Sequence, residues 1–223
     1  MKYYPVCLDV KNKKCLVIGG GDVGTRKALM LIKCNADVIV ISPKASEKLK
    51  VLSEKKVITL IKRQYKSDDI SDAFLVIGAT NNEKLNRRIF QDAQRLNKLC
   101  NIVDCPQLCN FILPSVVNRG DLILTVSTSG KSPAYAKKVR QTLENLFGEE
   151  HEIFLKLMGA IRKKLLMEAH EPDSYKPVFE KLISSGFIEL IKQDDVLKIN
   201  KKLVEILGKG YDFETLVKET EGE

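Results

Sequence analysis

The sequence predicts an α/β fold built on a doubly wound parallel sheet, and three observations carry this prediction. Short β-branched runs alternate with helical patterns in the first half of the chain, as βαβ units require. The first run leads directly into a glycine-rich turn and then into a helical pattern. Polar residues follow several runs where parallel strands would end, and sheets of this kind bind ligands at those ends.

Five apolar runs have the length and composition of strands that are buried on both faces of a sheet. In chain order they are Cys15–Ile18, Asp37–Ile41, Val57–Ile61, Phe74–Ala79 and Cys100–Val103. The helices expected between them cover Val23–Cys34, Ala45–Lys55 and Asn82–Leu96. An additional strand is expected ahead of the sheet over Tyr3–Val10, at an edge because Pro5 lacks a backbone donor.

The second half of the chain has a different pattern. Ser115–Ser127 reads as a hairpin around a turn at Arg119–Asp121, and a helix follows over Ala134–Phe147 with Pro133 in its first turn. The remainder is helical and rich in lysine. Its helices are expected to break near Pro172, Gly186 and Gly208–Gly210, and its last residues, 219–223, are expected to fray. These changes predict three domains, over 1–113, 114–148 and 149–223.

The glycine-rich turn has the pattern of a dinucleotide site. Gly19, Gly21 and Gly24 satisfy G-x-G-x-x-G between a strand and a helix. In this motif the three glycines permit, in order, the tight turn, the approach of a pyrophosphate and close packing of the helix on the strand. The free N–H groups at the helix start would then hold the phosphates. The alternative is a tight strand-to-helix turn that binds nothing.

Three other strand ends carry polar residues. Ser42-Pro43-Lys44 ends the second run and replaces the acid that usually binds the NAD ribose, so the residues alone leave NAD and NADP both open. Thr80 and Asn81 follow the fourth run. Asp104 follows the fifth, where a carboxylate facing the cofactor crevice can accept a proton. Asp104 is the best catalytic candidate, and the alternative for it is a cap or turn residue.

The cysteines do not have the spacing of a metal site. Cys100, Cys105 and Cys109 form C-x4-C-x3-C, without a C-x2-C pair and with the two histidines, His151 and His170, far away in the sequence. No bound metal is therefore expected. All six cysteines of the chain are interpreted as reduced thiols of a cytosolic protein.

A second loop is a candidate anion site. Gly130-Lys131-Ser132 is similar to the end of a P-loop, but the position of the first P-loop glycine holds Thr125, which disfavours a nucleotide triphosphatase. The loop nevertheless offers hydroxyls, backbone N–H groups and an ammonium at the start of a helix, which together would hold an anion. Its residues are Thr128, Ser129, Gly130, Lys131 and Ser132.

Composition narrows the class of protein. The chain has 223 residues, of which 44% are hydrophobic, and no run approaches the ~18 apolar residues of a membrane span. Without a signal-peptide pattern either, we expect a cytoplasmic protein that does not enter the membrane. The formal net charge of +8 is explained by a lysine-rich solvated surface or by a partner with several negative charges. Nucleic acid is disfavoured as that partner, because no basic block is interleaved with aromatic residues.

Taken together, these segments resemble the precorrin-2 dehydrogenase/sirohydrochlorin ferrochelatase family, of the sirohaem-synthase N-terminal type. The likeness covers about residues 1–147 in fixed order. It rests on Val17–Lys27, Ala79–Asn81, Asn101–Pro114, Arg119–Gly120 and Ser127–Pro133. From the extent of the likeness we expect these 223 residues to include no counterpart of the methyltransferase domain that is fused to some relatives.

The resemblance implies a cytoplasmic homodimer that oxidises precorrin-2 to sirohydrochlorin with NAD. The family's essential aspartate falls on Asp104, and its cofactor contacts fall on the glycine loop, including Asp22 and Val23, and on Pro43–Lys44. Segment 114–148 would be a dimerisation region, and the helical end would complete a tetrapyrrole cleft. Some members have serine at the position of Thr128, where this chain keeps the hydroxyl.

The anionic tetrapyrrole gives the positive charge of the chain a partner, because this substrate carries eight carboxylates. Whether the protein also inserts ferrous iron into sirohydrochlorin is left open. The competing interpretation is a non-catalytic nucleotide-sensing module, which would need neither the loop Asp104–Pro106 nor the anion loop. A short-chain dehydrogenase is disfavoured, because it needs tyrosine and lysine four apart, whereas Val139 stands four residues after Tyr135.

Overall fold

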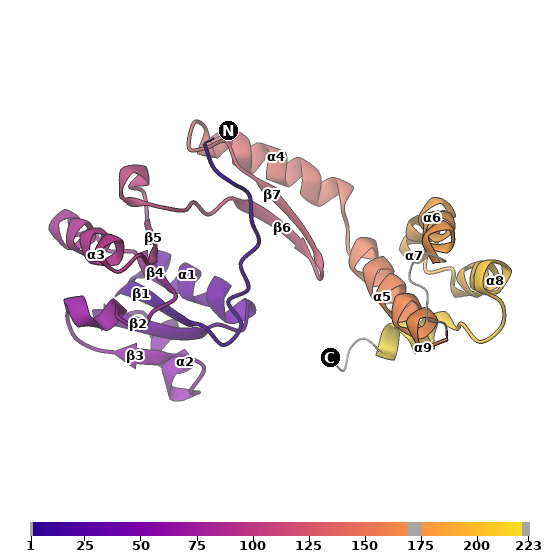
Figure 1. The fold of residues 1–223 in the computed structure, drawn as a ribbon, viewed down its shortest axis with the longest axis horizontal. Coiled ribbons are helices and arrows are strands. Elements are labelled where there is room, and N and C mark those ends of the chain that lie inside the picture. The colour runs from indigo at the N-terminus through magenta and orange to yellow at the C-terminus, as the bar shows by residue number, and fades with distance from the viewer. Residues whose placement is uncertain (1, 169–174, 220–223) are drawn as a thin grey trace. The chain divides into compact units, whose positions relative to one another are not determined.

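The computed structural model describes residues 2–168 and 175–219, and the chain divides into two units, Met1–Leu113 and Pro114–Glu223. The first unit is a five-stranded parallel sheet with the strand order β3-β2-β1-β4-β5 (Figure 1). The strands are β1 Lys14–Gly20, β2 Asp37–Ala45, β3 Thr59–Ile61, β4 Leu75–Gly78 and β5 Leu99–Ile102. The predicted doubly wound fold is confirmed.

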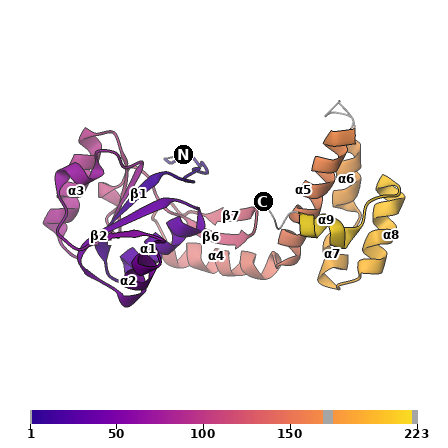
Figure 2. The same cartoon turned by 90° about the horizontal axis from the view of Figure 1, so that it is seen from below.

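Helices cover both faces of this sheet because each strand is apolar on both sides. Val17 of β1 packs with Ala28 and Leu31 of α1 (Asp22–Lys33) and with Leu49 of α2 (Glu47–Glu54). The neighbouring β1 residue, Leu16, points to the opposite face. There it packs with residues of α3 (Glu83–Arg95) and of the short 3₁₀ helix η1 (Ser67–Ile70), and Figure 2 shows these layers from below.

The strand order reverses between β1 and β4: β2 and β3 follow β1 on one side of the sheet, and β4 and β5 lie on the other. β1 is hydrogen-bonded to β2 on one side and to β4 on the other. The segments that leave β1 and β4 therefore diverge, and the crevice between them lies outside the carboxyl ends of the strands. The glycine turn, Gly19–Gly24, spans the end of β1 and the start of α1, which puts it at this crevice.

Two sequence expectations about the sheet are wrong. Tyr3–Val10 forms no strand, and the alternating apolar side chains Tyr4, Val6 and Leu8 are exposed. Ser42–Lys44 does not end β2, which continues to Ala45. A register shift in the pairing of β1 with β2 brings Gly20 opposite Ala45, and a side chain at Gly20 would collide with the carbonyl of Lys44.

The second unit begins with the predicted hairpin, which is confirmed as an antiparallel pair, β6 (Ser115–Arg119) and β7 (Leu122–Val126). Gly120 provides the positive φ, 61°, that its tight turn needs. The helix α4 (Pro133–Leu146) follows. The Arg119 guanidinium donates to the carbonyls of Phe147 at 2.8 Å and Glu144 at 3.2 Å, which fixes the hairpin to the end of α4.

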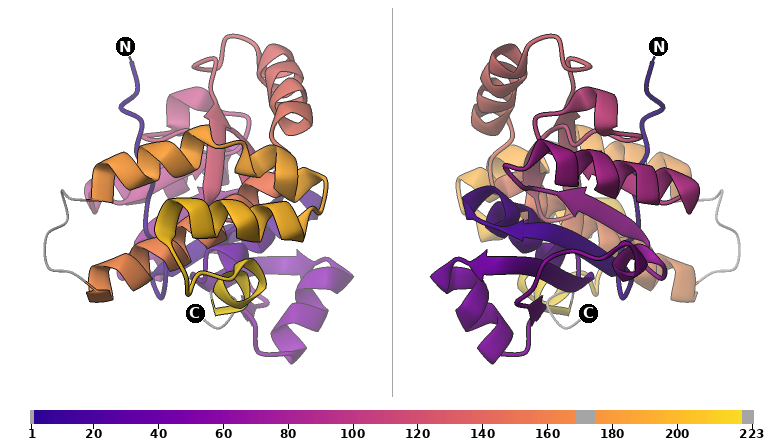
Figure 3. Two further views of the ribbon diagram at one scale, coloured as in Figure 1. Left: turned by 90° about the vertical axis from the view of Figure 1, so that its right-hand side faces the viewer. Right: turned by 90° about the vertical axis from the view of Figure 1, so that its left-hand side faces the viewer.

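The rest of the second unit is a bundle of short helices around its own core (Figure 3). The helices are α5 Glu150–Glu168, α6 Lys176–Ser184, α7 Phe187–Lys192, α8 Val196–Leu207 and α9 Phe213–Glu219. The breaks predicted at Gly186 and Gly208–Gly210 are confirmed, since all three glycines have positive φ between helices. The expected break at Pro172 and the residues 220–223 lie outside the described residues.

None of the helices in 2–168 and 175–219 is long and apolar enough to cross a membrane. The assignment of the ranges 1–113, 114–148 and 149–223 to three domains with separate roles stays a prediction.

Candidate functional site

A cleft of about 660 Å³ lies at the carboxyl ends of the parallel strands. Its lining brings together most residues that the sequence predicts for the cofactor and for catalysis. These are Gly19, Gly21, Asp22, Val23, Ser42, Pro43, Thr80, Asn81 and Asp104. Gly24 and Lys44 do not line the cleft. The strand order thus joins segments that are up to 85 residues apart in the chain.

The glycine turn is shaped by close contacts between backbone segments. Gly19 has φ 116°, and a side chain there would collide with the carbonyl of Ala79. A side chain at Gly24 would collide with the carbonyl of Gly19, so this glycine lets α1 pack against the turn. Gly21 differs from both, because a Cβ there would have nothing within 4 Å. Its surroundings are open on the side from which a ligand would approach.

The start of α1 fits a phosphate group. The first N–H groups of any α-helix have no partner within the helix. Gly21 is the N-cap of α1, and no side chain caps the helix at that position. Together with the open space at Gly21, this leaves donors of the first turn available to an anion in the cleft. The residues present therefore fit the pyrophosphate of a dinucleotide.

The end of β2 provides fewer donors for a 2′-phosphate than its sequence suggests. The Ser42 hydroxyl donates to the carbonyl of Lys44 at 2.6 Å and is largely buried. Its proton is therefore already used within the strand. Pro43 lines the cleft, whereas Lys44 is exposed outside it. The Ser42 hydroxyl is therefore not free to donate to the 2′-phosphate of NADP.

Thr80 and Asn81 differ in how their side chains are engaged. The Thr80 hydroxyl donates to the side-chain carbonyl of Asn86 at 2.7 Å, and the Asn86 amide donates back to the carbonyl of Thr80 at 3.0 Å. Asn82 caps α3 by accepting from the N–H of Leu85. Thr80 thus shapes the turn after β4, and Asn81 is exposed at the cleft. The sequence reading missed this pairing with buried Asn86, because Asn86 has no motif of its own.

Asp104 stands in an unusual backbone conformation at the cleft. Its φ is 58°, in the left-handed region that few residues other than glycine adopt. The turn is held on both sides, by the N–H of Val103 bonded to Gly78 at 2.9 Å and that of Cys105 bonded to Ile102 at 3.2 Å. The exposed carboxylate lines the cleft. Aspartate adopts this region more readily than most residues, so the conformation fits a turn at the end of β5.

Lys27 is a further charged residue that interacts electrostatically with Asp104, and the sequence analysis did not identify it. Burial lowers the pKa of its ammonium, the neighbouring charge of Arg26 lowers it further, and the carboxylate of Asp104 acts in the opposite direction. Lys27 therefore lies within electrostatic reach of Asp104.

Comparison with known proteins agrees with this geometry. Residues 6–115 match the family described as putative NAD(P)-binding, and residues 119–146 match the central family of sirohaem biosynthesis proteins. The chain is 33% identical over 211 residues to the siroheme synthase of Mannheimia succiniciproducens and 35% identical over 211 residues to that of Actinobacillus succinogenes. The chain is similar to sirohaem synthases along most of its own length.

The match covers nearly all of this chain but only part of these sirohaem synthases. It covers 95% of this chain but 44% of each of the two relatives, so the chain spans less than half of their length. A solved structure titled "SirC, precorrin-2 dehydrogenase" has the same fold, with a TM-score of 0.75. It is 23% identical in sequence and covers 90% of this chain and 100% of its own.

Two of the three cysteines near Asp104 in the sequence have structural surroundings. Burial raises the pKa of the Cys100 thiol to about 12. Burial also raises the pKa of Cys109, whose Sγ lies 3.3 Å from both the N–H and the carbonyl of Ile102. Within 2–168 and 175–219, no group of three or more His, Cys, Asp or Glu side chains is placed to hold a metal ion.

The candidate anion loop belongs to the second unit, and its hydroxyls are partly used. Thr128 accepts from the N–H of Ser132 at 3.1 Å, and Ser132 caps α4 by accepting from the N–H of Tyr135 at 3.2 Å. Ser129 and Gly130 have positive φ, 53° and 82°. Lys131 is exposed. The loop thus presents the exposed Lys131 at the start of α4. Its Thr128 and Ser132 hydroxyls mainly stabilise the turn.

The lining residues that sequence reasoning missed include Gln64, Tyr65, Leu85 and Arg88. Tyr65 is 5% exposed, and its hydroxyl donates to Asp92 at 2.9 Å. Burial and this bond raise its pKa. The residues come from the loop after β3 and from α3, neither of which carries a recognised motif.

Proposed function

We propose that this chain oxidises precorrin-2 to sirohydrochlorin with NAD⁺ as the hydride acceptor. The observation that carries the proposal is that the glycine turn and Asp104 line the same cleft. The names of the relatives, siroheme synthase and precorrin-2 dehydrogenase, support this substrate and this reaction. The putative NAD(P)-binding match supports the cofactor.

Different residues of the chain bind the cofactor and accept the proton in this reaction. When bound, NAD⁺ supplies the site that accepts a hydride from the macrocycle. The first turn of α1 holds the pyrophosphate, and the ends of β2 and β4 flank it, through Pro43 and Asn81. Oxidation also releases a proton from the macrocycle, and Asp104 accepts it. A hydride and a proton leave the substrate, so charge and electrons balance.

The anion loop, Thr128–Ser132, would bind carboxylates of the substrate, with Lys131 as its exposed cation. We also propose a cytoplasmic homodimer. A reducing compartment is supported by the six cysteines, all of which are free thiols. Insertion of ferrous iron into sirohydrochlorin is a second step that the same base would serve, because metal insertion removes protons from ring nitrogens.

The test is incubation of the full chain with precorrin-2 and NAD⁺, followed by visible absorption. Sirohydrochlorin and NADH should appear together in equal amounts. Parallel reactions with NADP⁺ test the choice of cofactor, and a higher kcat/KM with NADP⁺ would contradict NAD. Binding of NAD⁺ without any turnover of precorrin-2 would favour the nucleotide-sensing alternative.

A further inference from the structure

The cleft extends well beyond the glycine turn, and its two ends differ. One end lies by β5 and contains Val103 and Asp104. The other end is bounded by Ser42 and Pro43 of β2 on one side. The opposite boundary, here called the outer wall, consists of Gln64, Tyr65, Leu85 and Arg88. Nothing in the proposed reaction yet uses the outer wall.

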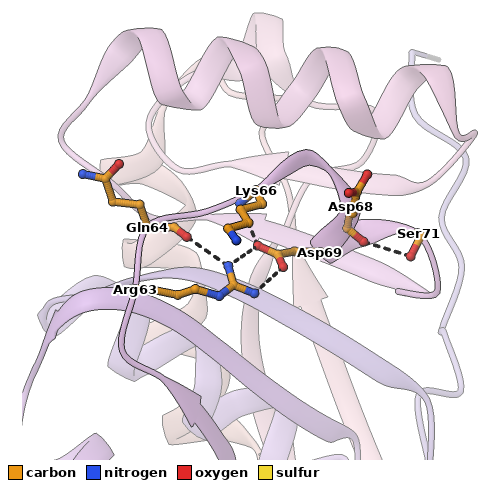
Figure 4. A network of polar contacts seen from close by, with 6 residues as sticks. All are labelled: Arg63, Gln64, Lys66, Asp68, Asp69 and Ser71. Atoms are coloured by element: carbon orange, nitrogen blue, oxygen red, sulfur yellow. Dashed lines mark hydrogen bonds and ion pairs between the residues drawn. The ribbon is translucent and has the colours of Figure 1, made fainter.

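An ion pair holds the loop after β3, which carries Gln64 and Tyr65 of the outer wall (Figure 4). The Arg63 guanidinium donates to both carboxylate oxygens of Asp69, at 2.8 and 2.6 Å, and to the carbonyl of Gln64 at 2.9 Å. Asp69 also accepts from the N–H of Lys66 at 2.7 Å. The Asp69 side chain is 10% exposed. These bonds close the loop after β3, so Gln64 and Tyr65 keep a defined position.

Arg88 is positioned by the same loop. Its guanidinium donates to the Ser67 hydroxyl through Nη2 at 2.8 Å and Nε at 3.3 Å, and it lies over the Tyr65 ring at 5.8 Å. Asp92 stands one helical turn further along α3, 3.9 Å from Nε. Despite these contacts, the Arg88 side chain is 54% exposed. A planar cation is thus fixed at the rim of the cleft while much of its surface stays open.

We infer that the recess between Pro43 and the outer wall takes the adenine ring of the cofactor, and that Arg88 is the residue that stacks on this ring. The inference rests on the proposed dinucleotide site. With the pyrophosphate at the start of α1 and the ribose at the end of β2, the adenine lies on the β2 side. The nicotinamide then lies towards Asp104, as hydride transfer requires.

The chemistry of the outer wall suits an aromatic ring. An arginine guanidinium is planar and weakly hydrated, so it stacks on aromatic faces, which a lysine ammonium does not do. Leu85 and Pro43 add apolar surface to the recess. Because Ser67 and Tyr65 already orient Arg88, little side-chain freedom remains to be lost on binding.

The test compares Arg88 with its neighbour on the same helix. Arg87 is exposed, does not line the cleft and carries the same charge. Calorimetric titrations of the full chain would use NAD⁺, ADP-ribose and nicotinamide mononucleotide. We expect Arg88→Ala to weaken NAD⁺ and ADP-ribose by about tenfold. Arg88→Ala should bind nicotinamide mononucleotide, which lacks adenine, with the wild-type Kd. Arg87→Ala should bind all three ligands with the wild-type Kd.

Two further variants separate stacking from charge and from folding. Arg88→Lys keeps the charge without the plane and should recover little of the affinity. Arg88→Met keeps the length and helix propensity and should bind like Arg88→Ala. An equal loss of affinity for nicotinamide mononucleotide would overturn the adenine assignment. Wild-type affinity in Arg88→Ala would also overturn it, whereas a wild-type protein that binds no NAD⁺ would overturn the proposed function itself.

Discussion

At the scale of single residues, the glycine turn separates folding from binding. Gly21→Asp places a side chain in open space and should fold normally, yet its carboxylate stands where the pyrophosphate binds. We expect the affinity for NAD⁺ to fall by about 2 kcal/mol or more. The matched variant Gly24→Ala meets the carbonyl of Gly19 and should instead lower stability, by about 1–3 kcal/mol. Titration and thermal melts distinguish the two outcomes, and unchanged NAD⁺ binding by folded Gly21→Asp would contradict the site.

Asp104 gives the sharpest test of the proposed chemistry. Asparagine tolerates the left-handed backbone at this position, so Asp104→Asn should keep the turn and the affinity for NAD⁺. It cannot accept a proton, and we expect sirohydrochlorin formation to slow by about 10²-fold or more. The rate should be measured at saturating precorrin-2, with NAD⁺ binding as the control. A wild-type rate would mean that Asp104 is only a turn residue.

At the scale of elements, the Arg63–Asp69 ion pair in the loop after β3 predicts that stability depends on pH. The Arg63 guanidinium holds the pKa of Asp69 below its usual value. A depressed pKa means that the stabilisation is present above the usual pKa of an aspartate and is lost as pH falls through the lower, folded value. Asp69→Asn should therefore be less stable than wild type at neutral pH, and this difference should shrink in acid.

Chemical denaturation at several pH values measures this effect. Asp68→Asn is the matched control, since the Asp68 side chain is exposed next to the pair and only its backbone carbonyl is bonded, to Ser71. A constant difference between Asp69→Asn and wild type across pH would show that the carboxylate charge is not responsible.

The sequence predicted elements well where periodicity and local chemistry agree. The runs that became β1, β4 and β5 are apolar on both faces, and the cap residues Ser46 and Asn82 begin helices close to the expected positions. Tyr3–Val10 has the alternation of a strand but no neighbour to pair with, and local pattern does not contain that information. The continuation of β2 through Pro43 depends on close packing against Gly20, which is likewise a tertiary contact.

The candidate site divides in the same way. The glycine motif and Asp104 were recognisable because their chemistry depends on residues that are adjacent in sequence or end a strand. The outer wall was not recognisable, because Arg88 and Tyr65 come together only through the packing of α3 on the loop after β3. Ser42 shows the reverse case: its residue type suggested a ligand contact, but its hydroxyl is bonded within β2.

At the scale of the whole molecule, the hairpin predicts self-association. Both strands of a two-stranded sheet have an unpaired edge, and Ile123 of β7 is 51% exposed in the single chain. Such an edge is a liability unless a partner covers it. We expect light scattering to give twice the chain mass of 25.1 kDa. Ile123→Lys should shift the protein towards the monomer, whereas Leu197→Lys, at an 85% exposed position of α8, should not.

A monomeric mass for the wild type at micromolar concentration would contradict this prediction. The same measurement on Leu197→Lys controls for the effect of an added surface charge. Dissociation of both variants would point to charge, and not to coverage of the hairpin, as the cause.

The uncapped start of α1 has a consequence for motion. In the free protein, Gly21 provides no side chain to hold the first-turn amides, whereas Ser46 and Asn82 do so for α2 and α3. A phosphate bound there would serve as the missing cap, so ligand affinity and local helix stability are thermodynamically linked. Amide hydrogen exchange at Asp22 and Val23 should therefore slow when NAD⁺ is added, while the first turn of α2 exchanges at its original rate.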